Sequence, residues 1–383
     1  MQILLALGGI VLIVLVLVDA FEAVVLPRRV TRKFRPARLF YRLAWSVWRA
    51  AALGLPRGKR RQDFLSVFGP FSLLALFAVW ATVLIIGFAL VHWALATPLC
   101  LANDDRQRGF GLYLYMSGVT FFTLGYGDVA PSAALGRLLA VVEAGTGFGF
   151  LAVIIGYLPS FSQASSQREI TISLLDARAG SPPTAAEGIL RAARSGRVSS
   201  LVPFFAEWER WAAQLLESHL SYPMLVYYRS QHDNQSWLAA LTAVLDGSAL
   251  MIAGITDVDC YQAQLTFAMA RHAVVDLSLV LKVPPRAPAA DRLPPEEFER
   301  LRRLFAEAGV HFHESGKTEQ RVAELRAMYE PFAAALSDWL LFPLPPIVSA
   351  TEPVDNWQTS PWTRRTPGIG ALPGAEVENE HFQ

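Results

Sequence analysis

Long stretches without charged side chains constrain this chain more than any other feature. Phe64 to Val91 holds 28 residues and no charge, and Leu138 to Phe161 holds a single charged residue, Glu143. A third apolar stretch runs from Ile3 to Leu26. A helix of about 20 residues crosses a hydrocarbon core of about 30 Å, so each stretch can span a membrane. We predict an all-α membrane protein built from these spans. Roughly half the chain lies outside the membrane segments, which is enough for a separate domain.

The charges between the first two stretches predict an orientation. Pro27 to Gln62 contains twelve Lys or Arg and no acidic residue. Basic loops stay in the cytoplasm, so we expect the N-terminus outside, the C-terminus in the cytoplasm and the plasma membrane as the location. A signal peptide is disfavoured because no basic residue precedes the first apolar run. Asp19 and Glu22 should meet the arginines that follow them, with a functional relay as the alternative.

Four arginines of this basic segment have the spacing of a voltage-sensing helix: Arg29, Arg32, Arg35 and Arg38. Such a helix needs apolar residues between its arginines, whereas Pro36 interrupts this series. We expect instead an interfacial helix from about Arg38 to Leu53. It would place Tyr41, Trp45 and Trp48 among lipid headgroups, which makes membrane lipids an expected partner. A net charge of +1 gives no reason to expect a nucleic-acid partner.

The most specific motif follows the stretch Tyr113 to Phe122 and consists of Thr123, Leu124, Gly125, Tyr126, Gly127 and Asp128. Glycine takes left-handed backbone conformations at low cost, so alternating glycines let successive carbonyl groups point the same way. A row of carbonyl groups can replace the water around a cation. The motif resembles the selectivity filter of potassium channels. Its place between two apolar spans argues against a chance glycine-rich turn.

The resemblance to the bacterial potassium channel family implies a set of ion-binding residues. The K⁺ sites would be lined by the backbone carbonyl groups of Thr123, Leu124, Gly125 and Tyr126. The side-chain hydroxyl of Thr123 would line them as well. Gly127 and Asp128 would form the outer mouth. Potassium is then the permeant ion, and no cofactor is expected. One loop cannot encircle an ion and the chain has one copy, so the resemblance also implies a homotetramer.

The same resemblance, which covers about Phe64 to Phe161, implies an outer helix, a pore helix, the filter and an inner helix. The pore helix would run from Phe110 to Phe122. The segment from Thr97 to Gly109 would form a short turret outside the membrane. His92 and Trp93 would mark the outer interface.

Two positions before the filter differ from the usual pattern of the family. Many bacterial channels have a glutamate four residues before the filter threonine. Here Val119 stands there, so the buried hydrogen bond of that glutamate should be missing. Where a tryptophan often stands, this chain has Tyr115, whose hydroxyl could still reach Asp128. Phe122 replaces the second threonine of the usual pair.

The inner helix carries the expected gating residues. Gly147 lies where related channels place a hinge glycine, so we expect the inner helix to bend or rotate there during gating. The alternative is that Gly147 serves close helix packing and that the filter itself is the gate. Phe148, Leu151 and Ile155 share one helical face, which we expect to line the pore. For Glu143 we expect a buried bond to the pore helix or to a neighbouring subunit, with attraction of cations in the pore as the alternative.

Composition changes after Pro159. We expect a polar linker from Ser160 to Gln167, and then an all-α bundle, because helical periodicity recurs without alternating strands. The expected helices are Ala185–Arg194, Leu201–Leu220, Ser236–Ile252, Asp257–Lys282, Pro295–Ala308 and Thr318–Leu341, with caps at Thr184 and Asp257. No GxGxxG motif or β-roll pattern indicates a nucleotide-binding regulatory domain, and the bundle resembles no family that we identify.

The chain thus divides into five expected parts: an N-terminal transmembrane helix (1–27), a basic segment (28–63), a pore domain (64–161), a helical cytoplasmic domain (168–342) and a disordered tail (343–383). We predict a non-enzymatic, passive potassium channel that its helical domain regulates through an unidentified ligand. The alternative is a membrane-anchored sensor or enzyme whose helical domain carries the main activity.

Few residues of the helical domain favour that alternative. His272 and Asp276 are four apart on one expected helix face and are candidate metal ligands, with packed core or surface residues as the alternative. Further candidate ligands are His219, His232, Asp233, Asp257, Asp259, Cys260, His311 and His313. The polar segment from Tyr222 to Trp237 is either a functional loop or a cap and turn. Cys100 and Cys260 should lie on opposite sides of the membrane, so no disulfide between them is expected.

Overall fold

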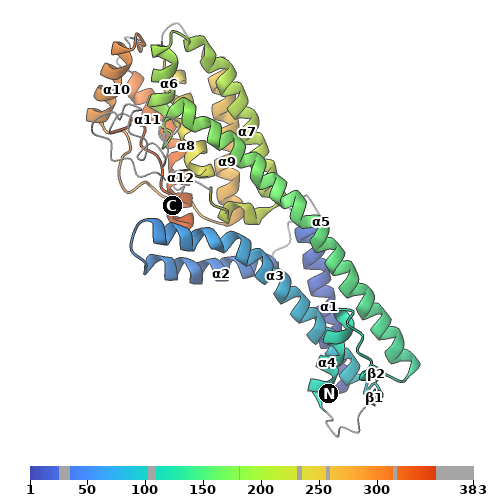
Figure 1. Cartoon of the computed structure of the whole chain (residues 1–383). Coiled ribbons are helices and arrows are strands. Elements are labelled where there is room, and N and C mark those ends of the chain that lie inside the picture. Colours follow the sequence, from blue (N-terminus) through green and yellow to red (C-terminus); the bar gives the residue numbers. More distant parts are fainter. Residues whose placement is uncertain are drawn as a thin grey trace, which may run out of the picture. The chain divides into compact units, whose positions relative to one another are not determined.

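A computed structural model describes residues 1–25, 35–101, 109–180, 182–230, 235–255, 259–313 and 317–350. The described chain is helical apart from one two-stranded sheet and one isolated bridge, which confirms the all-α membrane fold (Figure 1). It forms two compact units. Unit 1 comprises Met1–Leu55 and Val67–Gln163, and unit 2 comprises Pro56–Ser66 and the chain from Ala164 onward. The expected basic segment is therefore not a separate part, because its residues are shared between the two units.

Unit 1 contains the predicted spans. Its elements are α1 (Gln2–Ala20), a π-helical turn (Phe21–Val25), α2 (Pro36–Leu53), most of α3 (Lys59–Ala94), β1 (Leu99–Leu101), α4 (Phe110–Phe121), β2 (Val129–Pro131) and the first part of α5 (Ala134–Ala179). Among the described residues, four helices are long and apolar enough to cross a membrane. Three of them, α1, α3 and α5, are the predicted spans. The fourth, α9 (Tyr261–Leu281), belongs to unit 2.

Helices α1 and α3 approach each other closely at a pair of glycines. A β-carbon added to Gly9 would lie 2.6 Å from the carbonyl oxygen of Gly87, and one added to Gly87 would lie 2.8 Å from Cγ1 of Ile13. Inside a membrane, small residues let two helix backbones pack at short range. The two glycines therefore hold α1 against the outer helix of the pore segment, a contact that apolar periodicity does not reveal.

The two acidic residues at the end of the first span behave differently from each other. Glu22 lies 3.8 Å from Nε of Arg35, as expected. The expectation was wrong for Asp19, which is buried and accepts hydrogen bonds from the amide of Ala37 (2.9 Å) and the indole of Trp80 (3.0 Å). Asp19 thus satisfies an amide in the first turn of α2, where helix amides have no intrahelical partner.

Helix α2 forms close to the predicted bounds, and its aromatic side chains pack against α3. Tyr41 and Trp45 are buried, and the ring centroids of Trp45 and Trp48 lie 4.9 and 5.7 Å from that of Phe68 on α3. The position of these rings among lipid headgroups stays a prediction. Of the four evenly spaced arginines, Arg29 and Arg32 lie outside the described residues.

A short antiparallel sheet connects the segments on either side of the pore helix. Strand β1 pairs with β2 so that Leu99 faces Pro131 and Leu101 faces Val129. Three-residue strands carry too little alternation to be predicted. The middle of the expected turret, residues 102–108, lies outside the described residues.

The expected polar linker from Ser160 to Gln167 was wrong, because α5 is one continuous helix from Ala134 to Ala179 with Pro159 inside it. Proline removes one backbone hydrogen bond, and a long helix can retain its other bonds around that position. The serine and glutamine residues of the expected linker therefore lie within the helix. Residues from Ala164 onward belong to unit 2.

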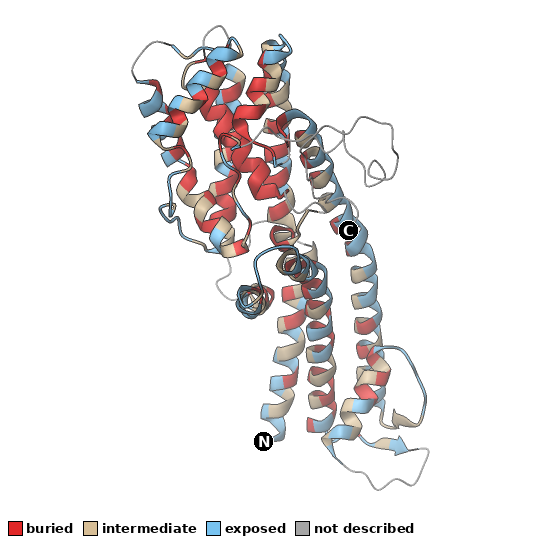
Figure 2. Ribbon diagram, turned by 60° about the vertical axis from the view of Figure 1, so that its left-hand side comes forward, coloured by how far each residue is buried: buried red, intermediate tan, exposed pale blue. Residues whose placement is uncertain are grey.

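Unit 2 is the predicted helical bundle. Its remaining helices are α6 (Ala185–Arg194), α7 (Leu201–Ser221), α8 (Trp237–Ile252), α9, α10 (Pro295–Glu307), α11 (Thr318–Ala327) and α12 (Glu330–Leu340), with short 3₁₀ turns at Val198–Ser200 and Pro223–Tyr227. Almost every residue of α8 is buried, so α8 forms the centre of the bundle (Figure 2). Helix α9 packs along α7 and α8, which explains its apolar composition.

Three predictions on unit 2 need comment. Thr184 accepts from the amide of Glu187 as the predicted cap (3.3 Å), whereas Asp257 lies outside the described residues. The single helix expected from Thr318 to Leu341 is two helices, because the backbone leaves helical geometry at Tyr329 and the second helix begins at Glu330, with Pro331 in its first turn. The expected disordered tail was wrong for residues 343–350, since Ile347 is buried in the core. Residues 351–383 lie outside the described chain.

Candidate ion-conducting site

The filter motif begins where the pore helix α4 ends. The amide of Leu124 donates to the carbonyl of Val119 (2.9 Å), and that of Thr123 donates to the carbonyl of Thr120 (3.0 Å). These bonds fold the start of the filter back onto the last turn of α4. The position of the filter therefore depends on the position of the pore helix.

The filter backbone alternates in handedness. Thr123, Gly125 and Gly127 have φ values of 55°, 62° and 76°, whereas no positive φ occurs at Leu124 or Tyr126. Glycine adopts this conformation without strain, which explains why glycine stands at two of the three positions. Alternation of the two hands is the geometry that turns successive carbonyl groups to one side, as the motif predicted.

The outer end of the filter is tied to the pore helix. The hydroxyl of Tyr115 donates to Oδ2 of Asp128 at 2.7 Å, so the predicted hydrogen bond is present. Val119 is buried, and its apolar side chain offers no hydrogen bond. It stands at the position where, by the resemblance given above, many bacterial channels have a glutamate. Tyr115 is thus the side chain that links α4 to the mouth.

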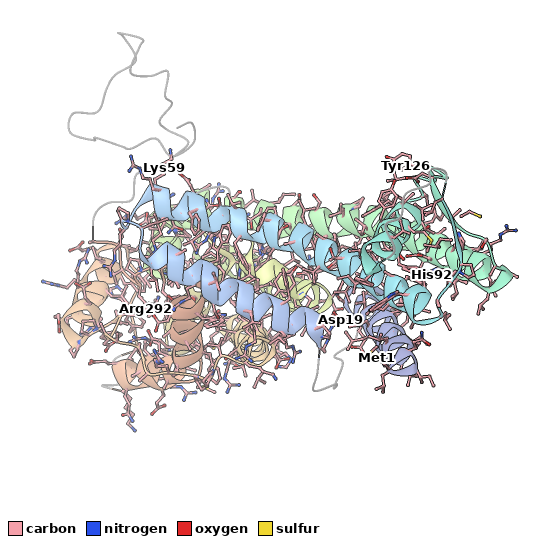
Figure 3. The ribbon with its side chains drawn as sticks, turned by 90° about the horizontal axis from the view of Figure 1, so that it is seen from below. Met1, Asp19, Lys59, His92, Tyr126 and Arg292 are labelled. Atoms are coloured by element: carbon pink, nitrogen blue, oxygen red, sulfur yellow. The ribbon has the colours of Figure 1, made fainter. Side chains whose placement is uncertain are left out.

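Large apolar side chains around the filter are uncovered in the single chain. Phe122, Leu124 and Tyr126 are 58%, 53% and 67% exposed. Tyr126 projects from the ribbon at the end of unit 1 that also holds His92 (Figure 3). Clusters of exposed apolar side chains mark surfaces that another molecule covers.

The inner helix α5 presents two different faces. Phe148, Leu151 and Ile155 are more than half exposed, as expected of a face that no part of its own chain covers. Gly147 lies against the pore helix instead, because a β-carbon there would be 1.9 Å from the carbonyl oxygen of Phe121. The contact favours the alternative reading of Gly147, close packing, over a free hinge.

Glu143 is fully buried within the single chain. Its Oε2 lies 3.8 Å from Nε2 of His92 on α3, and its neighbour on the pore helix is Ser117. This burial agrees with the expected interior position beside the pore helix and excludes a pore-lining position. His92, which was expected to mark the outer interface, is fully buried within the chain too, and its depth in a membrane stays a prediction. Neither His92 nor Ser117 stands out in the sequence, since both lie in otherwise apolar runs.

The candidate residues of the helical domain have structural partners. Among the described residues, no three His, Cys, Asp or Glu side chains are placed to hold a metal ion. His272 lies 3.5 Å from Asp276, and its side chain is 61% exposed. In the polar segment, Arg229 donates to the carbonyl groups of Leu340 (2.8 Å) and Leu341 (3.1 Å), so it holds the end of α12. Residues 231–234 of that segment lie outside the described chain.

A cavity of about 430 Å³ lies in unit 2 between the end of α5, α6 and α7. Two arginines line it, Arg178 and Arg191. Each is paired with a glutamate at 2.7 Å, Arg178 with Glu207 and Arg191 with Glu187. The cavity wall is therefore largely neutralised.

Comparison with known proteins agrees with this geometry. Residues 74–163 match a family model described as an ion channel. This segment is an ion channel domain. It contains the second part of α3, the helix α4, the filter motif and the first part of α5, so the match covers the part of the chain whose sequence resembles potassium channels. The chain is therefore a membrane protein with an ion channel domain, and its helical bundle remains unassigned.

Three curated relatives are similar over parts of the chain. The uncharacterized membrane protein YdjJ of Bacillus subtilis is 27% identical over 184 residues, which are 48% of this chain and 52% of that protein. Protein LctB of Bacillus caldotenax and that of Geobacillus stearothermophilus are 36% and 34% identical over 84 residues, which are 20% of this chain and 62% of each relative. The chain thus spans between half and two thirds of these relatives. No solved structure matches.

Proposed function

We propose that the chain forms a potassium-selective pore that conducts passively through the backbone carbonyl groups of Thr123, Leu124, Gly125 and Tyr126. The observation that carries the proposal is the alternating handedness at Thr123, Gly125 and Gly127. It supports a row of carbonyl oxygens that replaces the hydration shell of an ion. The pore would work without a cofactor, and K⁺ would be its cargo.

Four chains would surround the ion. Each contributes one filter loop, and the uncovered Phe122, Leu124 and Tyr126 supply apolar surface for neighbouring subunits. The exposed face of α5 with Phe148, Leu151 and Ile155 would then line the path toward the cytoplasm. The basic segment supports a plasma-membrane orientation with the C-terminus inside. Cysteines at Asp104 and Lys59 test it, since an impermeant thiol reagent should label only the first in intact cells.

The helical bundle would regulate the pore through α5. Arg168, in the part of α5 that belongs to unit 2, is buried and donates to the carbonyl groups of Leu225 (2.9 Å) and Tyr228 (3.0 Å). The amino-terminal part of the same helix carries the proposed pore face. A rearrangement of the bundle, driven by a ligand or by another stimulus, would therefore act on the helix that lines the pore.

Flux through reconstituted full-length protein tests the proposal. Liposomes loaded with KCl or NaCl should release K⁺ but not Na⁺, and Ba²⁺ should block the release. Gly125→Ala and Gly127→Ala should abolish the preference, because a β-carbon opposes positive φ. Gly149→Ala is the matched control, since nothing lies within 4 Å of its β-carbon position. Equal K⁺ and Na⁺ release by the wild-type protein would refute potassium selectivity.

Arg168→Met separates regulation from conduction. It removes the hydrogen bonds of the Arg168 side chain to the carbonyl groups of Leu225 and Tyr228, so the open probability should change while the preference for K⁺ over Na⁺ stays. An open probability equal to that of the wild type would refute regulation through this contact.

A further inference from the structure

A buried polar cluster lies behind the pore helix, outside the filter itself. It consists of His92 on α3, Ser117 on α4 and Glu143 on α5, each with no exposed surface. His92 Nε2 has no hydrogen-bond partner within the described chain. The carboxyl group of Glu143 has the hydroxyl of Ser117 as its neighbour on α4. A buried polar group that is left unsatisfied costs about 1–3 kcal/mol, so the protonation of these groups bears on the stability of the packing around them.

The separation of the groups limits how they can interact. Nε2 of His92 and Oε2 of Glu143 are 3.8 Å apart, which is too long for a direct hydrogen bond. The other ring nitrogen, Nδ1, lies 3.3 Å from the hydroxyl of Thr97. A water molecule needs two to four polar partners, and these three side chains converge from three helices. A proton shared through such a water would satisfy the histidine and the carboxyl together.

The charge of this pair depends on its proton count. With one proton, the histidine and the carboxyl are together neutral, either as an ion pair or as two uncharged groups. A second proton leaves a buried cation, and loss of the proton leaves a buried anion. An uncompensated charge at membrane depth is costly, so both changes strain the packing around the pair.

Few other titratable groups face the pair. Helix α4 contributes Tyr113, whose hydroxyl donates to the carbonyl of Thr97 (2.9 Å), and Tyr115, which is bound to Asp128 (2.7 Å). Nearest along α5 is Arg137, which donates to the carbonyl of Pro131 (3.3 Å). In the described chain, no Lys, Arg, Asp or Glu forms an ion pair with Glu143.

The cluster is connected to the filter by packing. Glu143 lies one helical turn before Gly147, and Ser117 lies one turn before Phe121, whose carbonyl contacts Gly147. The same faces of α5 and α4 therefore hold both the polar cluster and the closest backbone contact. We propose that Glu143, His92 and Ser117 form a buried proton-binding site that positions the pore helix and, through it, the filter. The inference rests on the proposed function, because filter position matters only if ions pass there.

Two readouts on the full-length protein in liposomes test the proposal. The first is infrared difference spectroscopy between about pH 5 and about pH 9, which detects the carbonyl stretch of a protonated carboxyl group. Wild-type protein should show a pH-dependent carboxyl band that Glu143→Gln removes. The control Glu299→Gln, an exposed carboxyl group paired with Arg302, should retain the band. No such band, or its survival in Glu143→Gln, would overturn the proton site.

The second readout is K⁺ efflux across the same pH range. Wild-type K⁺ flux should be maximal at an intermediate pH. It should fall about tenfold per pH unit along the acid limb and along the alkaline limb of the profile. Glu143→Gln should lose only the alkaline limb, and His92→Gln only the acid limb. The double variant should be independent of pH. A flat wild-type profile, or single variants with the wild-type profile, would overturn the coupling to the filter while leaving the proposed pore intact. If the wild type carries no K⁺, the proposed function fails and the infrared band alone decides the proton site.

Discussion

Replacing Gly147 by alanine is the sharpest test of how the inner helix meets the pore helix. The added β-carbon would lie 1.9 Å from the carbonyl oxygen and 2.8 Å from the carbonyl carbon of Phe121. Ordinary contact begins at 3.4 Å, so the two backbones must separate by about 1.5 Å. The neighbour is backbone and cannot rotate away as a side chain would. Phe121 is two residues before Thr123, so this displacement reaches the start of the filter.

The expected magnitude follows from two opposing effects. Overpacking costs about 1–3 kcal/mol, and a backbone clash belongs at the upper end of that range. Alanine in a helix gains up to about 1 kcal/mol over glycine. We expect a net destabilisation of about 1–2 kcal/mol for Gly147→Ala. Gly145→Ala on the same helix meets nothing within 4 Å and should be neutral or stabilising.

Single-channel recording and thermal unfolding measure the two consequences. Gly147→Ala should lower the unfolding temperature, the K⁺ conductance and the preference for K⁺ over Na⁺, because the pore helix shifts. A hinge would instead give a lower open probability with unchanged conductance. Wild-type conductance and selectivity in Gly147→Ala, with a stability equal to that of Gly145→Ala, would refute the packing argument.

Three further outcomes follow from single contacts. Gly87→Val should weaken the packing of α1 on α3 and lower the unfolding temperature, whereas Gly8→Val, with nothing within 4 Å, should not. Burial, and then the charge of Arg168, lower the pKa of His219 to about 3. The unfolded chain therefore binds the extra proton below about pH 6.5, and stability should fall by about 1 kcal/mol per pH unit between there and pH 3, a slope that His219→Gln should remove. Arg292→Met leaves the buried Asp246 without its guanidinium partner and should cost about 3–5 kcal/mol, whereas Arg302→Met breaks an exposed pair and should cost at most about 1 kcal/mol in chemical denaturation.

The sequence predicted those elements whose signal is local. Helix α6 has the expected bounds because a cap, an apolar stripe and a following glycine mark both ends. The filter motif was recognisable because the backbone geometry expected for it demands glycine at fixed positions, and the structure has positive φ at both glycines. The hydrogen bond from Tyr115 to Asp128 was predictable because Tyr115 stands where potassium channels, which the motif resembles, often have a tryptophan.

The features that the sequence did not reveal depend on contacts between residues far apart in the chain. His92 looked like an interfacial histidine beside Trp93, and only its approach to Glu143 on another helix shows that it is buried. Residues 343–350 were grouped with the tail because three of them are proline, but the carbonyl of Ile347 accepts from the amide of Ala186 and its side chain enters the core. Composition does not show such partners, since each residue is unremarkable within its own segment.

Crystallographic or cryo-electron-microscopic localisation of Tl⁺ or Rb⁺, which substitute for K⁺, tests the central claim most directly. The proposed pore predicts heavy-ion density on a fourfold axis, in a row beside the carbonyl oxygens of Thr123, Leu124, Gly125 and Tyr126. Gly125→Ala should lose that density. Heavy-ion density elsewhere in the chain, or an assembly in which these carbonyl groups face no common axis, would contradict the account.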